Sequence, residues 1–196
     1  MRTFQFFVIA IAAFTTTATA SEMTLCNPKE VVYFSCKIKN SEKIVSLCGS
    51  KYSEYFDAAD KLRINNNVWF QYRFGAPGKV ELAYPEQKKE SLKKFKAAYT
   101  KNLPGTTSSI FFVNNGIVYS VDVWEILIEN DDNSVIDNSF YGVVVMDEPS
   151  FFGRSPKSDQ DSSKKQRKME VRLPCAIKPT IGPEYGSVVF ALDINK

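Results

Sequence analysis

Four cysteines are the residues of this sequence with the clearest chemistry. They are Cys26, Cys36, Cys48 and Cys175, and the chain of 196 residues contains no histidine. An even number of cysteines in an exported chain is typical of disulfides. We expect a Cys36–Cys48 bond, because it would close a hairpin, and a Cys26–Cys175 bond, because it would tie the amino end to the last part of the chain. A zinc site is the weaker alternative, since the spacings are wide and no histidine completes a ligand set.

The absence of histidine restricts the catalytic chemistry of the chain. It excludes Ser-His-Asp and Cys-His catalysis and any histidine-ligated zinc or haem. No glycine-rich phosphate loop is present. Ser-Lys hydrolysis is permitted by residue type, but Ser155, Lys157, Ser163 and Lys164 lie in a segment that we predict to be a mobile loop. The motifs therefore predict no catalytic residue and no cofactor.

Carboxylates are the alternative candidates for catalysis, because paired acids can hydrolyse glycosides. The candidates are Glu81, Asp122 and Glu125. Asp122 is the unusual one, because it falls inside a predicted strand on the face of Trp124 and Ile126. The simpler interpretation of Asp122 is an exposed acid at a sheet edge. A carboxylate-dependent hydrolase is thus the second functional hypothesis.

Two further clusters are candidates for binding. The side chains of Asn130–Asn133 and Asp137 offer oxygen ligands for calcium, but their spacing is not that of an EF-hand. An exposed acidic turn is the simpler interpretation, so no metal site is predicted. Trp69 and Arg73 share a predicted strand face, and both residue types are enriched at binding hot spots. They are the predicted partner surface, the alternative being that a second sheet or a helix covers this face.

The first 20 residues have the three parts of a secretory signal peptide. Arg2 supplies the positive start, 4–14 is an apolar run and Ala18-Thr19-Ala20 fits a cleavage site. A membrane anchor is the alternative, but the apolar run is shorter than the roughly 20 residues that a spanning helix needs. We predict cleavage before Ser21, a periplasmic or secreted location, and one disulfide-bonded β domain over 21–196.

The charge balance argues against an anionic partner surface. The chain has a formal net charge of +3, and removing 1–20 takes away only Arg2 among the charged residues, which leaves +2. This value is too small to indicate nucleic acid or an anionic membrane as a partner. No other apolar run is long enough to cross a membrane. We expect an envelope or extracellular protein as the partner, and no membrane insertion after cleavage.

Two consecutive β-hairpins are predicted near the start of the mature chain. The strands of the first are 31–36 and 43–48, both rich in β-branched and aromatic residues. The second joins 68–75 to 79–84 through a Pro77-Gly78 turn, and Pro85 ends its return strand. Arg73 and Glu81 are expected to pair across the outer face of this second hairpin.

A third hairpin has the strongest turn signal in the sequence. Asn115-Gly116 separates a strand at 108–114 from a strand at 117–129, and this pair of residues is favoured in two-residue turns. A two-residue turn places Val113 opposite Val118 and Phe112 opposite Tyr119. The end of the second strand, 124–129, is apolar enough to be central in a sheet.

The rest of the chain supplies further elements. Leu92, Phe95 and Tyr99 recur at helical spacing among lysines, which predicts a surface helix over 87–101. The lysines at 88–96 are read as a solvated helix face in preference to a binding patch. Further strands are expected at 140–146, 169–173 and 187–194, a short helical turn within 52–62, and a mobile loop at 154–167. The fold class is mainly β, an antiparallel barrel or sandwich of about eight strands with one surface helix.

The opening strands resemble a family of small exported bacterial proteins of uncharacterised activity. The residues that carry the resemblance are Phe34-Ser-Cys36, Leu47-Cys48, Tyr72-Arg-Phe-Gly75 and Glu81-Leu-Ala-Tyr-Pro85. The resemblance implies a periplasmic or secreted location in a bacterium and no activity. The plan is also similar to the small periplasmic lysozyme inhibitors, without their inhibitory loop motif. The sequence therefore predicts an exported, non-catalytic binding or interaction protein.

Overall fold

The computed structural model describes residues 23–51, 69–102, 105–129, 134–149 and 170–193. The predicted signal peptide, the helical turn within 52–62, the loop 154–167 and Asn130–Asn133 lie outside these residues. The described part of the chain is mainly β, as predicted, and contains eleven strands and one α-helix. The strands are β1 Val31–Lys37, β2 Ile44–Gly49, β3 Phe70–Ala76, β4 Lys79–Tyr84, β5 Lys96–Asn102, β6 Gly105–Asn114, β7 Ile117–Glu129, β8 Val135–Asp137, β9 Phe140–Asp147, β10 Glu170–Pro174 and β11 Thr180–Ile181.

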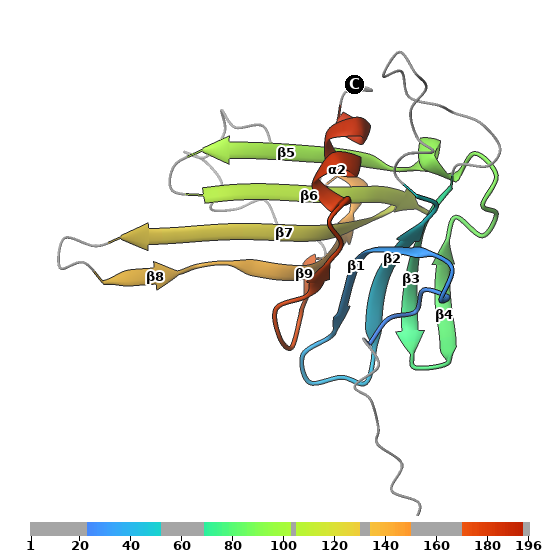
Figure 1. The fold of residues 1–196 in the computed structure, drawn as a ribbon, viewed down its shortest axis with the longest axis horizontal. Helices are drawn as coiled ribbons and strands as arrows, with labels where there is room; N and C mark the ends of the chain where they lie inside the picture. Colours follow the sequence, from blue (N-terminus) through green and yellow to red (C-terminus); the bar gives the residue numbers. More distant parts are fainter. Residues whose placement is uncertain (1–22, 52–68, 103–104, 130–133, 150–169, 194–196) are drawn as a thin grey trace, which may run out of the picture.

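The strands form two open antiparallel sheets that pack as a sandwich. Sheet 1 has the order β11-β1-β2-β3-β4, and sheet 2 has the order β10-β9-β7-β6-β5, with β8 paired to the end of β7. Strands of the two sheets run in clearly different directions, and sheet 2 extends well past sheet 1 on one side (Figure 1). The barrel alternative is not adopted, because neither sheet closes on itself among the described strands.

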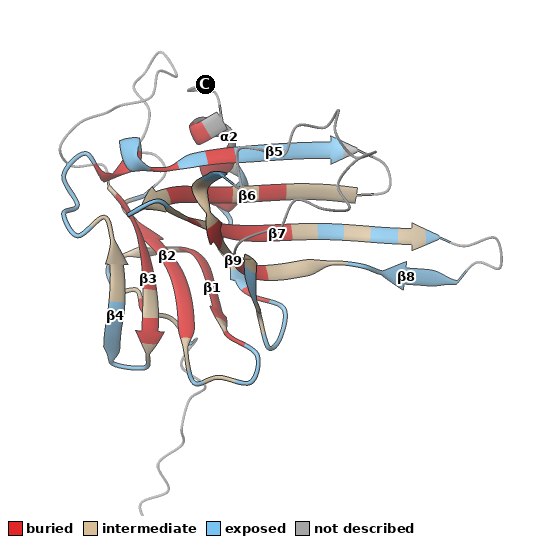
Figure 2. Ribbon diagram, turned by 180° about the vertical axis from the view of Figure 1, so that it is seen from behind, coloured by how far each residue is buried: buried red, intermediate tan, exposed pale blue. Residues whose placement is uncertain are grey.

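The core lies between the two sheets, where the buried residues concentrate in Figure 2. We call the side of each sheet that faces the other sheet its core face, and the opposite side its outer face. The core residues include Tyr33, Tyr72, Phe70, Ile110 and Val121, all almost completely buried. Aromatic side chains stack across it, as between Tyr84 and Phe112, whose ring centroids are 4.2 Å apart. Burial of such large apolar side chains is the main stabilising contribution to the fold.

The predicted hairpins are present. β1 pairs with β2 and β3 pairs with β4, the latter through the Pro77-Gly78 turn. β6 and β7 are joined by Asn115 and Gly116, whose φ angles of 52° and 74° are those of a type I′ turn. Val113 lies opposite Val118, and Phe112 opposite Tyr119, as predicted.

Both predictions of disulfide pairing are wrong. All four cysteines are bonded, but the pairs are Cys26–Cys48 and Cys36–Cys175. The physical reason is the register of the first hairpin, in which Cys36 lies opposite Val45 and Cys48 opposite Val32. The two cysteines therefore sit near opposite ends of the same ladder. The hairpin itself does not depend on a bond between them.

The predicted helix at 87–101 is wrong. Its place is taken by a 3₁₀ turn, η2 (Ser91–Lys94), and by the edge strand β5, which pairs with β6 along its whole length. Leu92, Phe95 and Ala97 are buried, whereas Tyr99 is 48% exposed, so the helical stripe is not formed. Pairing with a neighbouring strand has overridden the local pattern, as it often does for short segments.

The predicted last strand at 187–194 is also wrong, because this segment belongs to the helix α2 (Tyr185–Asp193). Tyr185, Val188, Val189 and Leu192 recur at i, i+3, i+4 and i+7, and all four are buried against the core. The helix lies across β5 and β6, as Figure 1 shows. The β-branched valines suggested a strand, but the spacing of the apolar residues is helical. No helix within the described ranges is both long and apolar enough to cross a membrane.

Candidate functional site

The predicted partner surface at Trp69 and Arg73 is mostly covered. Arg73 is only 6% exposed, because residues 23–30, which we call the strap, run over the outer face of β3. The prediction that Arg73 offers an exposed contact is therefore wrong, and so is its predicted pairing with Glu81. Glu81 instead binds Lys43 at 2.5 Å on the exposed side of the hairpin. The cover predicted as the alternative exists, but it is the strap and not a sheet or a helix.

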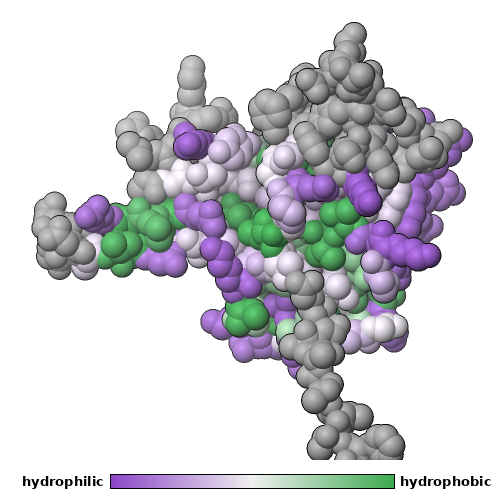
Figure 3. Space-filling model, in the orientation of Figure 1, coloured by the Kyte–Doolittle hydropathy of each residue, from purple (hydrophilic) through white to green (hydrophobic). Residues whose placement is uncertain are grey.

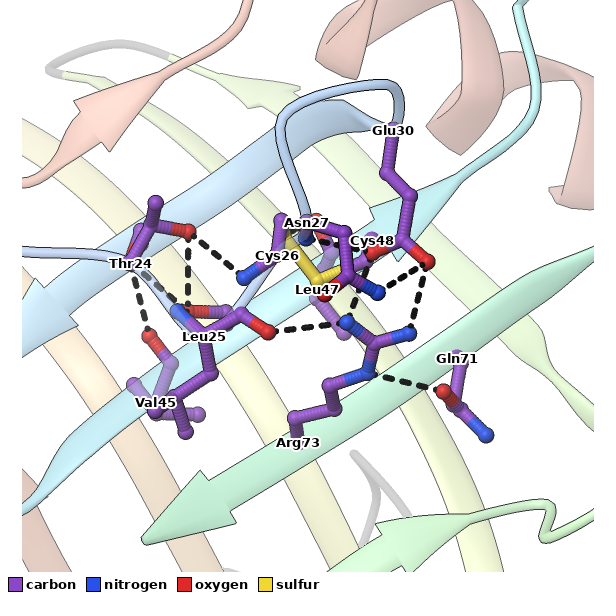
Figure 4. The surroundings of a disulfide bond; sticks show 12 residues. Thr24, Leu25, Cys26, Asn27, Glu30, Val45, Leu47, Cys48, Gln71 and Arg73 are labelled. Carbon is purple, nitrogen blue, oxygen red and sulfur yellow. Dashed lines mark hydrogen bonds and ion pairs between the residues drawn. A yellow bond between two sulfur atoms is a disulfide. The ribbon is translucent and has the colours of Figure 1, made fainter. Parts of the chain in front are cut away.

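Arg73 holds the strap through a buried ion pair, drawn in Figure 4. Its two terminal nitrogens donate to the carboxylate of Glu30 at 2.6 and 3.0 Å, a bidentate arrangement. One of these nitrogens also donates to the carbonyl oxygen of Leu25, and its Nε donates to Gln71. The side chains of Arg73 and Glu30 are 8% and 7% exposed. This site is built to fix the strap, and its arginine offers nothing to a partner.

Polar residues under the strap complete its attachment. The hydroxyl of Ser35 donates to the carbonyl oxygen of Met23, and the amide of Leu25 donates to Ser46. The Cys26–Cys48 disulfide joins the strap covalently to β2. Ser35 and Ser46 are buried, although each lies within a largely apolar strand. A small polar residue at such a position is the sequence signal that a polar segment covers this face, because a buried hydroxyl needs a hydrogen-bond partner.

Trp69 has a partner inside the protein. The ammonium group of Lys88 lies 3.8 Å from the centre of its ring and also binds Glu30 at 2.9 Å. A cation over a tryptophan face is a favourable contact. Lys88 therefore links the partly exposed Trp69 to the strap, and Trp69 is the part of the predicted surface that remains partly exposed.

The pKa of Glu30 determines how this site responds to acid. Partial burial would raise the pKa, but the hydrogen bonds from Arg73, Asn27 and Lys88 outweigh it and hold the pKa at about 2. In the unfolded chain the pKa of a glutamate is about 4.3. The ionised carboxylate therefore stabilises the fold above the unfolded pKa, and this contribution is lost as the pH falls through the folded pKa.

We expect the free energy of unfolding to fall between about pH 5 and about pH 2, with Glu30 contributing about 3 kcal/mol of that loss. Urea denaturation at several pH values measures it. The Glu30→Gln variant is the comparison: it is less stable at pH 7 and should lose correspondingly less on acidification. Equal losses in the two proteins would contradict this role of Glu30.

The candidate carboxylates for hydrolysis are not brought together. Asp122 is 4% exposed on the outer face of sheet 2, where Ser120 donates a hydrogen bond of 2.5 Å to it. Glu125 is three residues along the same strand, on the core face, and accepts from Tyr141 while Lys178 lies 3.5 Å away. Glu81 belongs to sheet 1. Because Asp122 and Glu125 point to opposite faces, they cannot flank one glycosidic bond. The prediction of an exposed Asp122 is wrong as well.

The described residues hold one group with the spacing of metal ligands. Cys26, Glu30 and Cys48 offer atoms within 4.8 Å of one another. Both cysteines are in the disulfide, and Glu30 is bonded to Arg73, so these atoms are already engaged. Asp137, the described member of the predicted calcium candidates, is bonded to Ser139, and these hydrogen bonds lower its pKa. Neither group is arranged to hold a cation.

The lysines at 88–96 are divided between two roles. Lys88 and Lys93 bind Glu30 and Glu90, whereas Lys89, Lys94 and Lys96 are exposed. Lys96 opens β5, the last strand of sheet 2, and lysines on an edge strand discourage pairing with other chains. The solvated interpretation therefore applies to exposed lysines of a loop, a 3₁₀ turn and a strand edge, in place of the predicted helix.

The most unusual surface of the described chain is a projecting arm. We define the arm as residues 125–129 of β7 together with β8, the part of sheet 2 that extends beyond the sandwich (Figure 1). Leu127 is 57% exposed, Val135 60% and Ile136 45%. Hydrophobic residues gather on this arm in the space-filling view (Figure 3). The sequence predicts a strand here that is apolar enough to be central in a sheet, whereas the arm exposes these residues.

Comparisons with protein-family models, with curated proteins and with solved structures found no match to this chain. The resemblance of the opening strands to small exported bacterial proteins therefore stays an expectation from the sequence. The residues that carry this resemblance lie in the first two hairpins. They include Cys36 of β1 and Cys48 of β2, each bonded to a cysteine outside the first hairpin, so their role is structural.

Proposed function

We propose that this protein is an exported, non-catalytic interaction protein that works in the bacterial periplasm or outside the cell. Two disulfides support the compartment, because such bonds persist in an oxidising environment. The amino-terminal pattern of a signal peptide agrees with it.

The observation that carries the proposal is the arm. Large apolar side chains clustered on an exposed projection mark surfaces that bind other proteins. Leu127 and Val135 lie on the same face of the arm, since Leu127 is opposite Asp137 and Glu129 is opposite Val135. An exposed apolar surface of this kind suits the binding of a partner. The candidate carboxylates for hydrolysis are not brought together, so binding is the better supported of the two functions.

Cross-linking in the producing cell tests the proposal. We expect the protein in the periplasmic or secreted fraction, without reactive thiols, and in cross-linked products that the double variant Leu127→Ser with Val135→Thr loses. Val80→Thr is the matched control, because Val80 is 46% exposed but belongs to β4 of the other sheet. Products that persist in the arm variant, or a cytoplasmic protein with free thiols, would count against the proposal.

A further inference from the structure

The core face of sheet 2 does not end where the sandwich ends. Ile110, Val121 and Val143 are cross-strand neighbours on this face and are buried in the core. Because side chains alternate along a strand, Leu127 of β7 continues the same face on the arm. The cover supplied by sheet 1 stops before this region, as the view in Figure 1 shows. The arm therefore presents an uncovered extension of the hydrophobic core face.

Four rows of residues lead from the buried core onto this uncovered face. The first row runs from the exposed Tyr99 through the buried Ser108 and Val123 to the partly buried Tyr141, and the second contains Lys101, Thr106 and Glu125. The third pairs Leu127 with Asp137, and the fourth pairs Glu129 with Val135. Tyr99, Leu127 and Val135 are each about half exposed or more, at 48%, 57% and 60%. We call these rows, with the adjacent Lys178, the arm face.

The composition of β7 on the arm is that of a strand buried on both sides. Residues 124–129 contain one tryptophan, two isoleucines and one leucine against only two glutamates, and such a largely apolar run is typical of central strands. In the structure, β8 flanks Leu127–Glu129 on one side, and on the other side the ladder with β6 starts only at the Gly105–Ile126 pair. A sequence suited to the middle of a sheet therefore lies at its projecting end.

The charges of the arm face are of both signs. Lys101 and Lys178 are exposed on it, and so are Glu125, Glu129 and Asp137. One pair, Lys178 with Glu125, is satisfied within the chain at 3.5 Å. An interface between two identical chains related by a two-fold axis brings a patch against itself, so the patch must complement its own charges. A face of one sign would repel its copy, whereas apolar residues bordered by both signs meet this condition.

We propose that the occupant of the arm face is a second copy of this chain, so that two molecules bury Leu127, Val135 and Tyr99 against one another around a two-fold axis. The proposal rests on the proposed function, because it names the partner of the same arm. In the dimer, Lys101 of one molecule lies near Glu129 and Asp137 of the other, and the apolar residues form the centre of the contact.

Sedimentation velocity of the purified, oxidised protein over a range of micromolar concentrations tests the proposal. We expect a reversible dimer whose dissociation constant rises with added salt, because the charged pairs at the rim are screened. The double variant Leu127→Ser with Val135→Thr should raise the dissociation constant by about tenfold or more. Ile136→Thr is the matched control: Ile136 is adjacent to Val135 on β8 but lies on the outer face opposite Ile128, and its substitution should leave the dimer intact.

Circular dichroism and the absence of reactive thiols establish that each variant is folded and oxidised. A wild-type protein that stays monomeric at concentrations up to about 100 µM overturns the proposal. So does a dimer that Ile136→Thr weakens more than the double variant. The cross-linking experiment distinguishes failure of the dimer from failure of the proposed function. Arm-dependent products that contain another protein would leave the proposed function standing while refuting the dimer. If the wild-type protein forms no cross-linked product that depends on the arm, both the proposed function and the dimer are refuted.

Discussion

Substituting both Cys36 and Cys175 by alanine is expected to lower the free energy of unfolding by about 5 kcal/mol in the chain-entropy description of disulfides. The bond spans 139 residues, so it removes much of the freedom of the unfolded chain. Alanine is the suitable replacement because Cys36 is buried beside the core, where a serine hydroxyl would need a partner. Urea denaturation measures the loss as a shift of the midpoint.

The Cys26–Cys48 pair gives the comparison for this prediction. Its separation is 22 residues, and the same description assigns it about 3 kcal/mol from loop entropy. The junction around Cys175 also has support from backbone hydrogen bonds: the amide of Cys175 donates to Tyr141, and that of Ala176 donates to Lys37. A loss below about 1 kcal/mol in the Cys36–Cys175 variant would show that these contacts hold the junction without the disulfide.

Arg73→Met should destabilise the protein by about 3 to 5 kcal/mol, because it leaves the buried carboxylate of Glu30 without its main partner. Methionine keeps most of the aliphatic volume of arginine, so the loss reports the charge and not a cavity. The variant also removes the hydrogen bonds to Leu25 and Gln71. Urea denaturation at pH 7 measures the change, and faster proteolysis of the strap should accompany it.

Two further variants define the origin of this loss. Adding Glu30→Gln to Arg73→Met removes the unpaired charge, so the double variant should be more stable than Arg73→Met alone. Lys43→Met is the matched control, because it breaks the exposed ion pair between Lys43, which precedes β2, and Glu81 of β4, and it should have a far smaller effect. A similar loss in Lys43→Met and Arg73→Met would mean that burial of the Glu30 pair is unimportant.

Local turn chemistry made part of this fold predictable from the sequence. A two-residue type I′ turn requires positive φ angles at both central residues, and asparagine followed by glycine adopts them most readily, as Asn115 and Gly116 do. The register on either side of it then follows residue by residue. The Pro77-Gly78 turn specified the second hairpin in the same way, but its register, with an irregularity between Phe74 and Gly75, places Arg73 opposite Ala83 and not opposite Glu81.

Errors arose where distant parts of the chain decide the outcome. β5 is a strand because β6 pairs with it, and no local pattern of Leu92, Phe95 and Tyr99 contains that information. α2 was recoverable, since the buried Tyr185, Val188, Val189 and Leu192 have helical spacing, but the valines outweighed the spacing in our reading. Disulfide pairing was not recoverable, because four cysteines permit three connectivities and only the assembled sheets bring Cys175 beside β1.

For the candidate site, too, the sequence indicates which residues are of interest, but distant contacts decide whether they are exposed. Residue type singles out Trp69 and Arg73 as a partner surface, but the strap that buries Arg73 comes from a segment without regular structure. The arm was visible in the sequence as an apolar strand, and only its position at the end of sheet 2 shows that it is exposed. Composition identified the residues in both cases, and the topology determined which of them face solvent.

The two disulfides are interlaced along the chain, and this affects how the protein matures. In order of synthesis the first cysteine bonds the third, and the second bonds the fourth. Cys36 emerges before Cys48 but its partner is 139 residues away, so it must stay reduced until nearly the whole chain is present, or be released from a temporary bond by thiol–disulfide exchange. An oxidant that joins cysteines as they appear would trap Cys26 with Cys36. Correct maturation therefore favours a compartment that can reshuffle disulfides as well as form them.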